Sequence, residues 1–184
     1  MLYLIAQGFW FILPAMWSNM APVWAKKVRI LDWLDVPIDA NKKLFGKPIM
    51  GRNKTYRGFV AGAAFATFIG MLQWLLSETF PVFDRLEFFE LGFADYLALS
   101  LLLGFGALVG DAVESFFKRL FEIPPGEAWV PLDQIDYVIG ALIFSIPIGA
   151  LTNGEYAAAA FVGVALHPVA TFVGWKLGLK DKPI

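Results

Sequence analysis

Five long apolar stretches, separated by polar segments, dominate this sequence. An α-helix needs about 20 residues to cross the ~30 Å hydrocarbon layer of a bilayer, and within that layer its backbone groups are hydrogen-bonded internally. Each stretch is long enough or nearly so, and Asp95 and Asp111 are the only charged residues within them. The sequence therefore predicts an all-α integral membrane protein with five transmembrane helices. The stretches are residues 1–25, 58–77, 91–113, 137–154 and 156–175.

The composition excludes several other classes of protein. Hydrophobic residues make up 58% of the chain and charged residues 17%, whereas soluble domains have about 45–50% and about 25%. The formal net charge of −1 excludes a globally basic protein that binds nucleic acid. The absence of cysteine excludes a disulfide framework, a thiolate zinc site and a cysteine nucleophile. We expect a single membrane-embedded domain over residues 1–184.

The first stretch shares its hydrophobicity with signal peptides but lacks their other features. It has no basic residues at its start and no small-residue cleavage site before a hydrophilic segment. Proline removes a hydrogen bond from a helix and clashes with the preceding turn. We therefore expect a retained helix that is kinked or ended near Pro14 and Pro22.

The Lys and Arg residues gather on one side of the predicted spans. The segments 25–57 and 117–135, together with the tail from residue 176, hold 14 of the 15 basic residues, and Arg85 is the exception. Basic residues accumulate in the cytoplasmic loops of membrane proteins. This distribution predicts a multi-pass protein of the cell membrane with its N-terminus outside and its C-terminus in the cytoplasm. Two large polar segments would then face the cytoplasm.

Small residues recur every four positions in the second and third stretches. Such spacing lets the backbones of neighbouring transmembrane helices approach closely. We therefore expect these two stretches to pack tightly inside the bundle. The residues are Gly58, Gly62, Ala66 and Gly70 in the second stretch, and Gly106 and Gly110 in the third.

Acidic residues flank the cytoplasmic ends of the third and fourth stretches. If the third helix continues past the membrane boundary, four polar residues share one of its faces, because they are spaced at i, i+3, i+4 and i+7. Charged groups at membrane depth are costly, and such groups are usually functional. The four are Asp111, Glu114, Ser115 and Lys118, and a second acidic pair, Asp133 and Asp136, follows where the fourth stretch begins.

These carboxylates suit a hard divalent cation. Mg²⁺ prefers oxygen ligands in an octahedral arrangement and keeps water or phosphate in the remaining positions. If two neighbouring helices meet here, Asp111 and the pair Asp133 and Asp136 form a candidate Mg²⁺ site. Two simpler interpretations stay open. Glu114 and Lys118 have the spacing of an ordinary helical ion pair, and Asp133 is placed to cap the fourth helix.

A basic segment, residues 51–58, leads directly into the second stretch. It contains Arg52, Lys54 and Arg57 just before a helix N-terminus, where backbone N–H groups and the helix dipole favour anions. The segment lacks the spacing of a Walker A loop. It is a candidate site for a polyanion, although a flank that contacts lipid headgroups has the same composition.

Two further polar residues lie within the apolar stretches. Asn19 is near the inner end of the first stretch, where its amide needs either a helix carbonyl or a ligand as partner. His167 precedes Pro168, and we expect it to support a helix kink rather than catalysis. An acidic, cytoplasm-facing site beside a basic loop, embedded in lipid, is suited to a Mg²⁺–nucleotide that reacts with a phospholipid.

The polar motifs resemble those of a known family. Residues 110–119 have the pattern G-D-x-x-x-S-x-x-K-R, and residues 133–136 have the pattern D-Q-x-D; together they resemble the signature of the phosphatidate cytidylyltransferases. The runs at residues 14–22, 37–39 and 53–58 resemble the archaeal branch of that family, the CDP-archaeol synthases. Two positions depart from that archaeal pattern: Arg52 stands where an acidic residue is usual, and Ala40 stands in place of glycine.

The resemblance implies an activity and a set of site residues. It implies that a cytidylyl group passes from CTP to an archaeal ether-lipid phosphate, 2,3-bis-O-geranylgeranyl-sn-glycerol 1-phosphate, with release of pyrophosphate. The implied catalytic and metal-binding carboxylates, which would hold Mg²⁺, are Asp111, Asp133 and Asp136. Lys118 is also implied to be catalytic. The implied phosphate-neutralising residues are Lys54, Arg57, Lys118 and Arg119, and the other implied substrate-binding residues are Asn19, Asn53, Thr55, Glu114 and Ser115.

Three alternative functions remain at this point. A bacterial-type enzyme would act on an ester-linked phosphatidate with the same motifs. A small transporter would use Asp95, Asp111 and His167 as a permeation path, although the third stretch is apolar from residue 96 to residue 110. A structural membrane subunit would leave the clustered acidic and basic motifs without a role.

Overall fold

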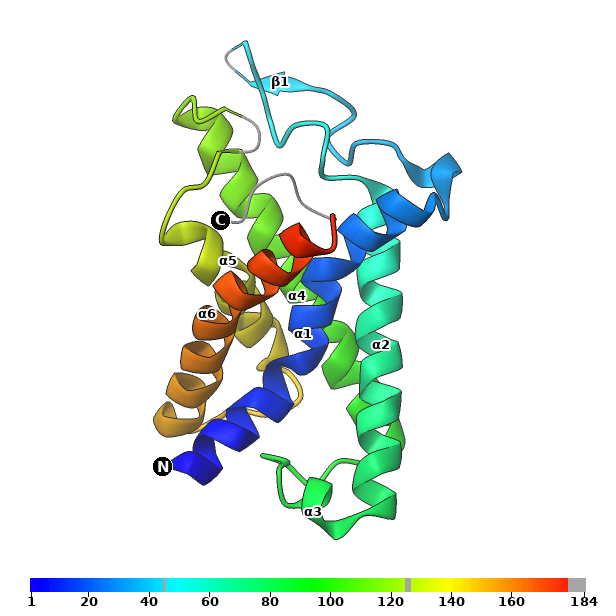
Figure 1. Ribbon diagram of the computed structural model, residues 1–184, viewed down its shortest axis with the longest axis vertical. Coiled ribbons are helices and arrows are strands. Elements are labelled where there is room, and N and C mark those ends of the chain that lie inside the picture. The colour runs from blue at the N-terminus through cyan, green and yellow to red at the C-terminus, as the bar shows by residue number, and fades with distance from the viewer. Residues whose placement is uncertain (45, 125–126, 179–184) are drawn as a thin grey trace.

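The computed structural model, which describes residues 1–44, 46–124 and 127–178, is almost entirely helical (Figure 1). The predicted all-α class is confirmed. The polar segment after α1 adds a 3-10 turn, η1 (Asp32–Leu34), and a short antiparallel pair, β1 (Lys43–Leu44) and β2 (Lys47–Pro48). The helices are α1 (Leu2–Val28), α2 (Tyr56–Thr79), α3 (Pro81–Asp84), α4 (Phe93–Leu120), α5 (Leu132–Ser145) and α6 (Asn153–Lys176).

Three helices, α2, α4 and α6, are long and apolar enough to cross a membrane. The chain is therefore a membrane protein with several candidate spans. Helix α1 has 27 residues and carries its first charged side chains in its last turn, at Lys26 and Lys27. Helix α5 has 14 residues, which corresponds to about 21 Å and is shorter than a hydrocarbon layer. Five complete crossings stay a prediction.

The fourth helix is displaced from the predicted stretch. The apolar run 137–154 suggested a span, whereas α5 begins at Leu132 and ends at Ser145. Pro147 explains the early end, since it has no N–H to donate to the carbonyl of Ile143 four residues earlier. As a consequence, Asp133 and Asp136 lie inside the helix.

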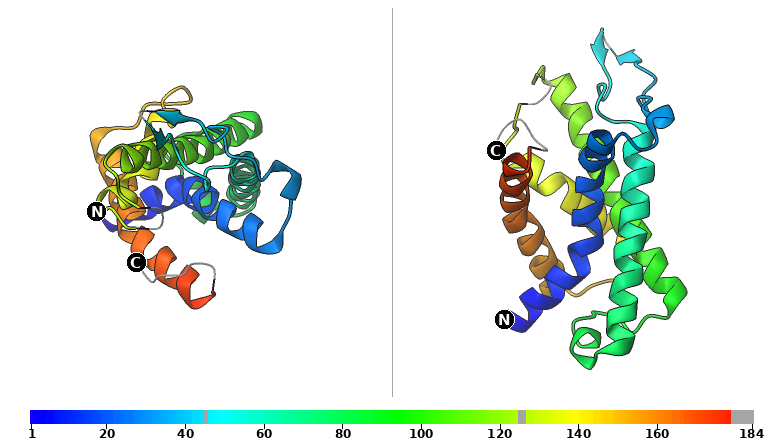
Figure 2. Two further views of the ribbon diagram at one scale, coloured as in Figure 1. Left: turned by 90° about the horizontal axis from the view of Figure 1, so that it is seen from above. Right: turned by 45° about the vertical axis from the view of Figure 1, so that its right-hand side comes forward.

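Helix α1 passes both of its prolines without ending, so termination near Pro14 or Pro22 was the wrong alternative. Figures 1 and 2 show that the first part of α1 runs at an angle to the rest. Pro14 cannot donate to the carbonyl of Trp10 four residues earlier. The buried side chain of Gln73 in α2 donates to that carbonyl instead, at 2.6 Å. A neighbouring helix therefore compensates for the hydrogen bond that α1 lacks.

Helix α2 packs against α1 and α4 through its small residues, as their spacing predicted. A Cβ atom added at Gly62 would lie 2.8 Å from Ser18 Oγ of α1, and one at Gly70 would lie 1.9 Å from Ser100 Oγ of α4. Ser18 Oγ also donates to the carbonyl of Gly104 in α4, at 2.9 Å. These contacts show that α1, α2 and α4 pack so closely that no side chain fits between them at these glycines.

Helices α4 and α5 meet even more closely. A Cβ atom at Gly140 would lie 2.1 Å from the carbonyl oxygen of Gly106, and one at Gly110 would lie 2.2 Å from the carbonyl oxygen of Asp136. Any side chain at these glycines would push the two helices apart. The contact places Asp136 of α5 beside the acidic face of α4.

The polar segments gather at one end of the bundle. Figure 1 shows the segment from α1 to α2, including β1, at the top, with the end of α4 and the start of α5 close by. The N-terminus and α3 lie at the opposite end, where the Tyr3 hydroxyl donates to the carbonyl of Arg85. The basic segment between α1 and α2 and the single basic residue Arg85 therefore lie at opposite ends of the bundle, as the sequence predicted. Lys180 and Lys182 lie outside the described residues.

A partly buried carboxyl group near the α3 end leads to a pH-dependent prediction. Burial raises the pKa of Glu87 above its usual value, against the opposing effect of hydrogen bonds with Ser77 and Tyr96. The contribution of such a group to stability is present below its unfolded-state pKa and is lost as the pH rises through its folded-state pKa. We therefore expect Glu87→Gln to raise the midpoint of thermal unfolding by about 2–4 °C near neutral pH.

Thermal unfolding in detergent, followed at neutral pH and at about pH 4, tests this expectation. Most of the gain should disappear at the lower pH, where Glu87 is largely protonated in both states. Glu90→Gln is a suitable control, because Glu90 is exposed in the same segment. An equal gain at both pH values would contradict the role of the buried carboxylate.

Candidate active site

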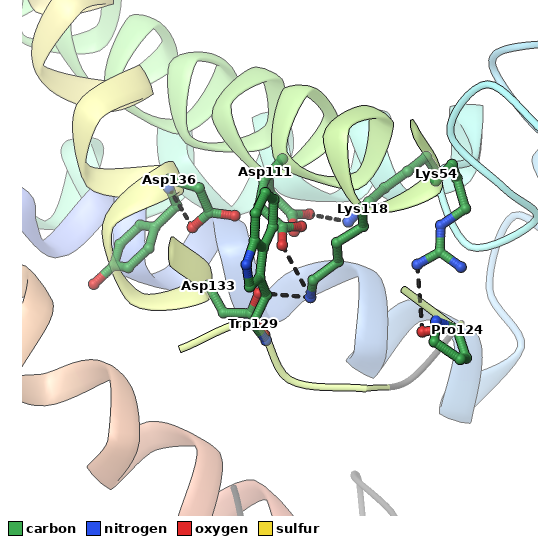
Figure 3. Close-up of polar contacts among 10 residues, drawn as sticks. Lys54, Asp111, Lys118, Pro124, Trp129, Asp133 and Asp136 are labelled. Carbon is green, nitrogen blue, oxygen red and sulfur yellow. Dashed lines mark hydrogen bonds and ion pairs between the residues drawn. The ribbon is translucent and has the colours of Figure 1, made fainter. Parts of the chain in front are cut away.

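Helix α4 continues past the predicted membrane boundary and displays the expected polar face. It runs to Leu120, so Asp111, Glu114 and Lys118 lie on successive turns of one helix. The Glu114 and Lys118 side chains are 7% and 11% exposed, and that of Asp111 is 29% exposed. The prediction that these residues share a face is confirmed, and Figure 3 shows two of them, Asp111 and Lys118.

Three carboxylates from two helices converge on one point. Asp111 and Glu114 of α4 and Asp136 of α5 each place a carboxylate oxygen within 4.8 Å of the other two. Asp136 Oδ1 also accepts a hydrogen bond from the backbone N–H of Tyr137, at 2.6 Å. We call these three residues the acidic triad. The expectation that Asp111 and Asp136 meet from neighbouring helices is confirmed.

The acidic triad could hold a metal ion. Carboxylate oxygens are the ligands that hard cations prefer, and Mg²⁺ binds them at about 2.1 Å, so that its opposite ligands lie about 4.2 Å apart. The oxygens of the triad all lie within 4.8 Å of one another, which is compatible with ligands of one ion. Three protein ligands would leave positions on such an ion for water and for phosphate oxygens.

Lys118 lies between two of the acidic residues. Its Nζ is 2.9 Å from Glu114 Oε1 and 2.5 Å from Asp133 Oδ1. The ion pair suggested by the spacing of Glu114 and Lys118 is therefore present, and Glu114 belongs to the acidic triad as well. Lys118 is thereby held at the edge of the triad.

Asp133 lies outside the acidic triad. Besides Lys118, it contacts the backbone N–H of Trp129, which donates to Asp133 Oδ2 at 3.0 Å. It is not the N-cap of α5, a position that Pro131 occupies. The structure thus brings Asp111 and Asp136 together and places Asp133 on a lysine, so a role for Asp133 as a metal ligand stays a prediction.

The basic segment before α2 reaches the acidic face. Lys54 forms a close ion pair with Asp111 Oδ2, and its side chain is 17% exposed. Thr55 fixes the position of Lys54, because its side chain accepts a hydrogen bond from Gly58 N and caps α2. The Lys54 carbonyl accepts from Ile38 N at 2.9 Å. Two motifs that lie 57 residues apart therefore form one site.

Asp39 organises the loop that carries this segment. Its carboxylate accepts hydrogen bonds from three backbone N–H groups, those of Asn41 at 2.9 Å, Met50 at 2.9 Å and Gly51 at 3.2 Å. Gly51 has φ +88°, a conformation that glycine adopts readily and other residues rarely do. Asp39 therefore shapes the backbone just before Lys54.

Arg57, which the motif implied to contact phosphate, pairs with two carboxylates of the protein in this structure. Its guanidinium lies 2.7 Å from Asp32 Oδ1 and 2.9 Å from Asp35 Oδ1, and its side chain is 6% exposed. This residue thus anchors η1 to the start of α2 in this structure. Sequence reasoning missed Asp32 and Asp35. Their signal was an acidic pair one turn apart within an otherwise cation-rich segment.

The remaining predicted residues differ in their burial and in their partners. Ser115 is buried in α4, and Asn53 is exposed in the loop before α2. Arg119 Nη2 donates to the carbonyl of Pro124 at 3.5 Å. Asn19 lines a pocket between α1, α5 and α6, together with Tyr137. These four are not brought into contact with the triad by any hydrogen bond within the described residues.

A second ion pair links the β-hairpin to the end of α4. Lys47 Nζ lies 2.8 Å from Glu122 Oε1 and donates to the carbonyl of Leu120 at 3.2 Å. Hydrogen bonding to Lys47 holds the pKa of the exposed Glu122 carboxyl below its usual value. The hairpin is therefore attached to the helix that carries the acidic triad.

The chain is similar along nearly its whole length to proteins of one family. The CarS-like family, described as CDP-archaeol synthase, matches residues 1–184. The CDP-archaeol synthases of Thermococcus onnurineus and Pyrococcus furiosus are each 36% identical over 180 residues, covering 96% and 97% of this chain and 95% and 98% of those proteins. That of Methanocaldococcus jannaschii is 32% identical over 179 residues, covering 97% of this chain and 96% of that protein.

A solved structure shares the fold. It is described as an intramembrane enzyme for archaeal membrane lipid biosynthesis, and it superposes with a TM-score of 0.69 at 30% sequence identity. The match covers 88% of this chain and 90% of that structure. On the family match over its full length and these relatives, the chain belongs to the CarS-like family of CDP-archaeol synthases.

Proposed function

We propose that this chain makes its CDP-lipid by Mg²⁺-assisted transfer of the cytidylyl group of CTP to an archaeal ether-lipid phosphate. The acidic triad, flanked by two lysines at the polar end of an apolar bundle, carries this proposal. The family match supports a cytidylyltransferase in archaeal lipid biosynthesis. The substrate is 2,3-bis-O-geranylgeranyl-sn-glycerol 1-phosphate, and the second product is pyrophosphate.

The reaction needs positioning more than it needs a base. A phosphate monoester has its second pKa near 6, so the lipid phosphate is largely a dianion at neutral pH. One of its oxygens attacks the α-phosphorus of CTP, and a new P–O bond forms. The bond from that phosphorus to the oxygen bridging to the β-phosphate breaks, and pyrophosphate leaves. Alignment and charge neutralisation then provide most of the catalysis.

Each residue of the site has a part in that positioning. Asp111, Glu114 and Asp136 would hold Mg²⁺, which when bound would neutralise phosphate charge. Lys118 sits beside the triad, oriented by Asp133, where it can contact a phosphate oxygen. The other residues that we propose to contact or support the substrates are Asn19, Asn53, Lys54, Thr55, Arg57, Ser115 and Arg119.

We also propose that the bundle crosses the membrane with its polar end in the cytoplasm, where CTP is available. The asymmetry of the basic residues supports this orientation. Helix α1 would form a further crossing, and α5 would be embedded between α4 and α6 without spanning alone. Protease accessibility of the β-hairpin in oriented vesicles tests this arrangement. Cleavage from the outside would contradict it.

A direct assay tests the proposed reaction. Purified protein is given labelled CTP with either the archaeal ether-lipid phosphate or an ester-linked phosphatidate, in the presence and absence of a chelator. We expect CDP-lipid from the ether substrate and loss of product with the chelator. Preference for the ester lipid would identify a bacterial-type specificity. Product formation unaffected by the chelator would contradict the metal assignment.

Replacing Lys54 tests the basic segment. Charge-assisted hydrogen bonds to a phosphate contribute about 1.5–3 kcal/mol, so we expect Lys54→Ala to raise the KM for CTP or for the lipid phosphate at least about tenfold. Steady-state kinetics with each substrate varied in turn measures this effect.

Lys26→Ala is the matched control, because Lys26 is exposed at the end of α1 and we expect its kinetics to be unchanged. If the Lys54 variant also keeps the kinetic constants of the wild type, the segment contacts lipid headgroups rather than substrate.

A further inference from the structure

One pocket outside the acidic triad has not yet been given a role. It lies between α1, α5 and α6 and has an empty volume of about 480 Å³. Most of its lining is apolar, including Met16, Met20 and Val23 of α1 and Ala170 of α6. Such a lining suits hydrocarbon better than a nucleotide base, which needs several hydrogen-bond partners.

The indole of Trp24 lines this pocket and has a free donor. Its Nε1 atom is buried and has no hydrogen-bond partner among the residues that the structure describes. A buried donor without an acceptor is costly, and a ligand oxygen in the pocket would remove that cost. Tyr137 differs, because its hydroxyl already donates to the carbonyl of Gly163 at 2.7 Å. Trp24 is therefore a lining residue whose buried N–H lacks an acceptor within the part of the chain that the structure describes.

The pocket adjoins the acidic triad through two consecutive residues. Tyr137 lines the pocket and donates its backbone N–H to Asp136 of the triad, and consecutive Cα atoms lie about 3.8 Å apart. The second described cavity, about 330 Å³ and lined by Trp10 and Glu87, contains no residue of the triad and none adjacent to it in sequence. The pocket beside Tyr137 is thus placed to serve the reacting phosphate.

The rim of the pocket faces the surface that meets lipid. Trp17 of α1 and Val169 and Phe172 of α6 lie next to lining residues in sequence, and they are 39%, 54% and 44% exposed. Beyond Trp24, Lys27 Nζ donates to the carbonyl of Leu177 at 3.0 Å and ties the ends of α1 and α6 together. The pocket therefore lies between exposed apolar residues of α1 and α6 and Tyr137, the residue next to Asp136 of the triad.

We infer that this pocket binds the glycerol backbone and the first hydrocarbon units of the lipid phosphate, with Trp24 Nε1 donating to an oxygen of the glycerol phosphate. This inference rests on the proposed function. An amphiphile whose phosphate lies at the triad must carry its chains back into the bilayer, and the pocket touches both environments. Trp24 is then a substrate-binding residue outside the charged motifs.

Two variants separate the lipid from the nucleotide. Trp24→Phe keeps an aromatic ring and removes the N–H donor, and Ala170→Leu narrows the pocket from the opposite helix. At saturating CTP, we expect Trp24→Phe to raise the KM for the lipid phosphate about fivefold to tenfold. We expect a rise at least as large for Ala170→Leu. The KM for CTP should stay within about twofold in both.

Trp33→Phe is the matched control, since Trp33 is 76% exposed in η1, and it should retain every constant of the wild type. An unchanged lipid KM in both pocket variants overturns the inference, and so does a rise in the KM for CTP without one for the lipid. These results require a wild-type protein that makes CDP-lipid. A wild-type protein that makes none would contradict the proposed function instead, so the two failures are distinguishable.

Discussion

Asp136→Asn is expected to reduce CDP-lipid formation about a thousandfold. Asp136 is the single member of the acidic triad that comes from α5, and its carboxylate lies within 4.8 Å of those of Asp111 and Glu114. Metal-bound charge stabilisation contributes several kcal/mol to a transition state, and each 1.4 kcal/mol changes a rate about tenfold. Pyrophosphate release measures the rate, and binding of Mn²⁺, followed by electron paramagnetic resonance, reports the site independently of turnover.

Asp95→Asn is the control for this experiment. Asp95 is exposed in the first turn of α4, at the opposite end of the helix from the triad. We expect its activity and its Mn²⁺ binding to match the wild type. If the protein were a transporter, Asp95→Asn would impair its function more than Asp136→Asn, because Asp95 would then belong to the permeation path. Full activity in both Asp111→Asn and Asp136→Asn would remove the metal assignment.

The same readout separates the two interpretations of Asp133. Its contact with Lys118 indicates that Asp133→Asn keeps Mn²⁺ affinity but lowers the rate, since Lys118 loses a partner. Glu114→Gln is expected to weaken Mn²⁺ binding, because Glu114 belongs to the triad. The opposite pattern would restore Asp133 as a ligand, as its motif suggested.

Gly140→Ala is expected to destabilise the protein and to disrupt its site together. The new Cβ would lie 2.1 Å from the carbonyl oxygen of Gly106 and 2.9 Å from Gly110 N, and backbone atoms cannot move aside as a side chain can. Overpacking of this kind costs typically about 1–3 kcal/mol and occasionally more. Separation of α5 from α4 would also move Asp136 away from Asp111. The midpoint of thermal unfolding in detergent and the affinity for Mn²⁺ should both decrease.

Gly154→Ala is the matched control for this substitution. Gly154 lies in the first turn of α6, and the nearest atom to its added Cβ is Leu4 Cδ2 at 3.7 Å, an ordinary contact. Alanine favours helix more than glycine does, so this variant should be as stable as the wild type or slightly more stable. A Gly140 variant that unfolds at the wild-type temperature would show that the α4–α5 contact is adaptable.

Periodicity and charge placement predicted the helical class and the meeting of two acidic segments. The i, i+3 and i+7 spacing on α4 needs no tertiary information, because a continuous helix alone places Asp111, Glu114 and Lys118 together. The small-residue spacing likewise predicted close packing. The family resemblance was confirmed by the full-length match.

The details that sequence reasoning missed depend on the rotation and length of helices. Asp133 and Asp136 lie one turn apart on α5 and both face α4, and only the packing of Gly140 on Gly106 decides which carboxylate joins the acidic triad. The apolar run continues to residue 154, whereas α5 ends at Ser145 because Pro147 cannot donate the next helical hydrogen bond. The pairing of Arg57 with Asp32 joins residues 25 positions apart, and no local pattern contains it.

The charge balance of the site follows from these pairings. Four carboxylates meet two lysines, Lys54 and Lys118, which leaves two formal negative charges for one divalent ion to cancel. A triphosphate and a lipid phosphate would together bring several more negative charges than this balanced cluster can offset. We expect the exposed cations of the segment between α1 and α2, Lys42, Lys43 and Arg52, to supply counter-charge that attracts both anionic substrates.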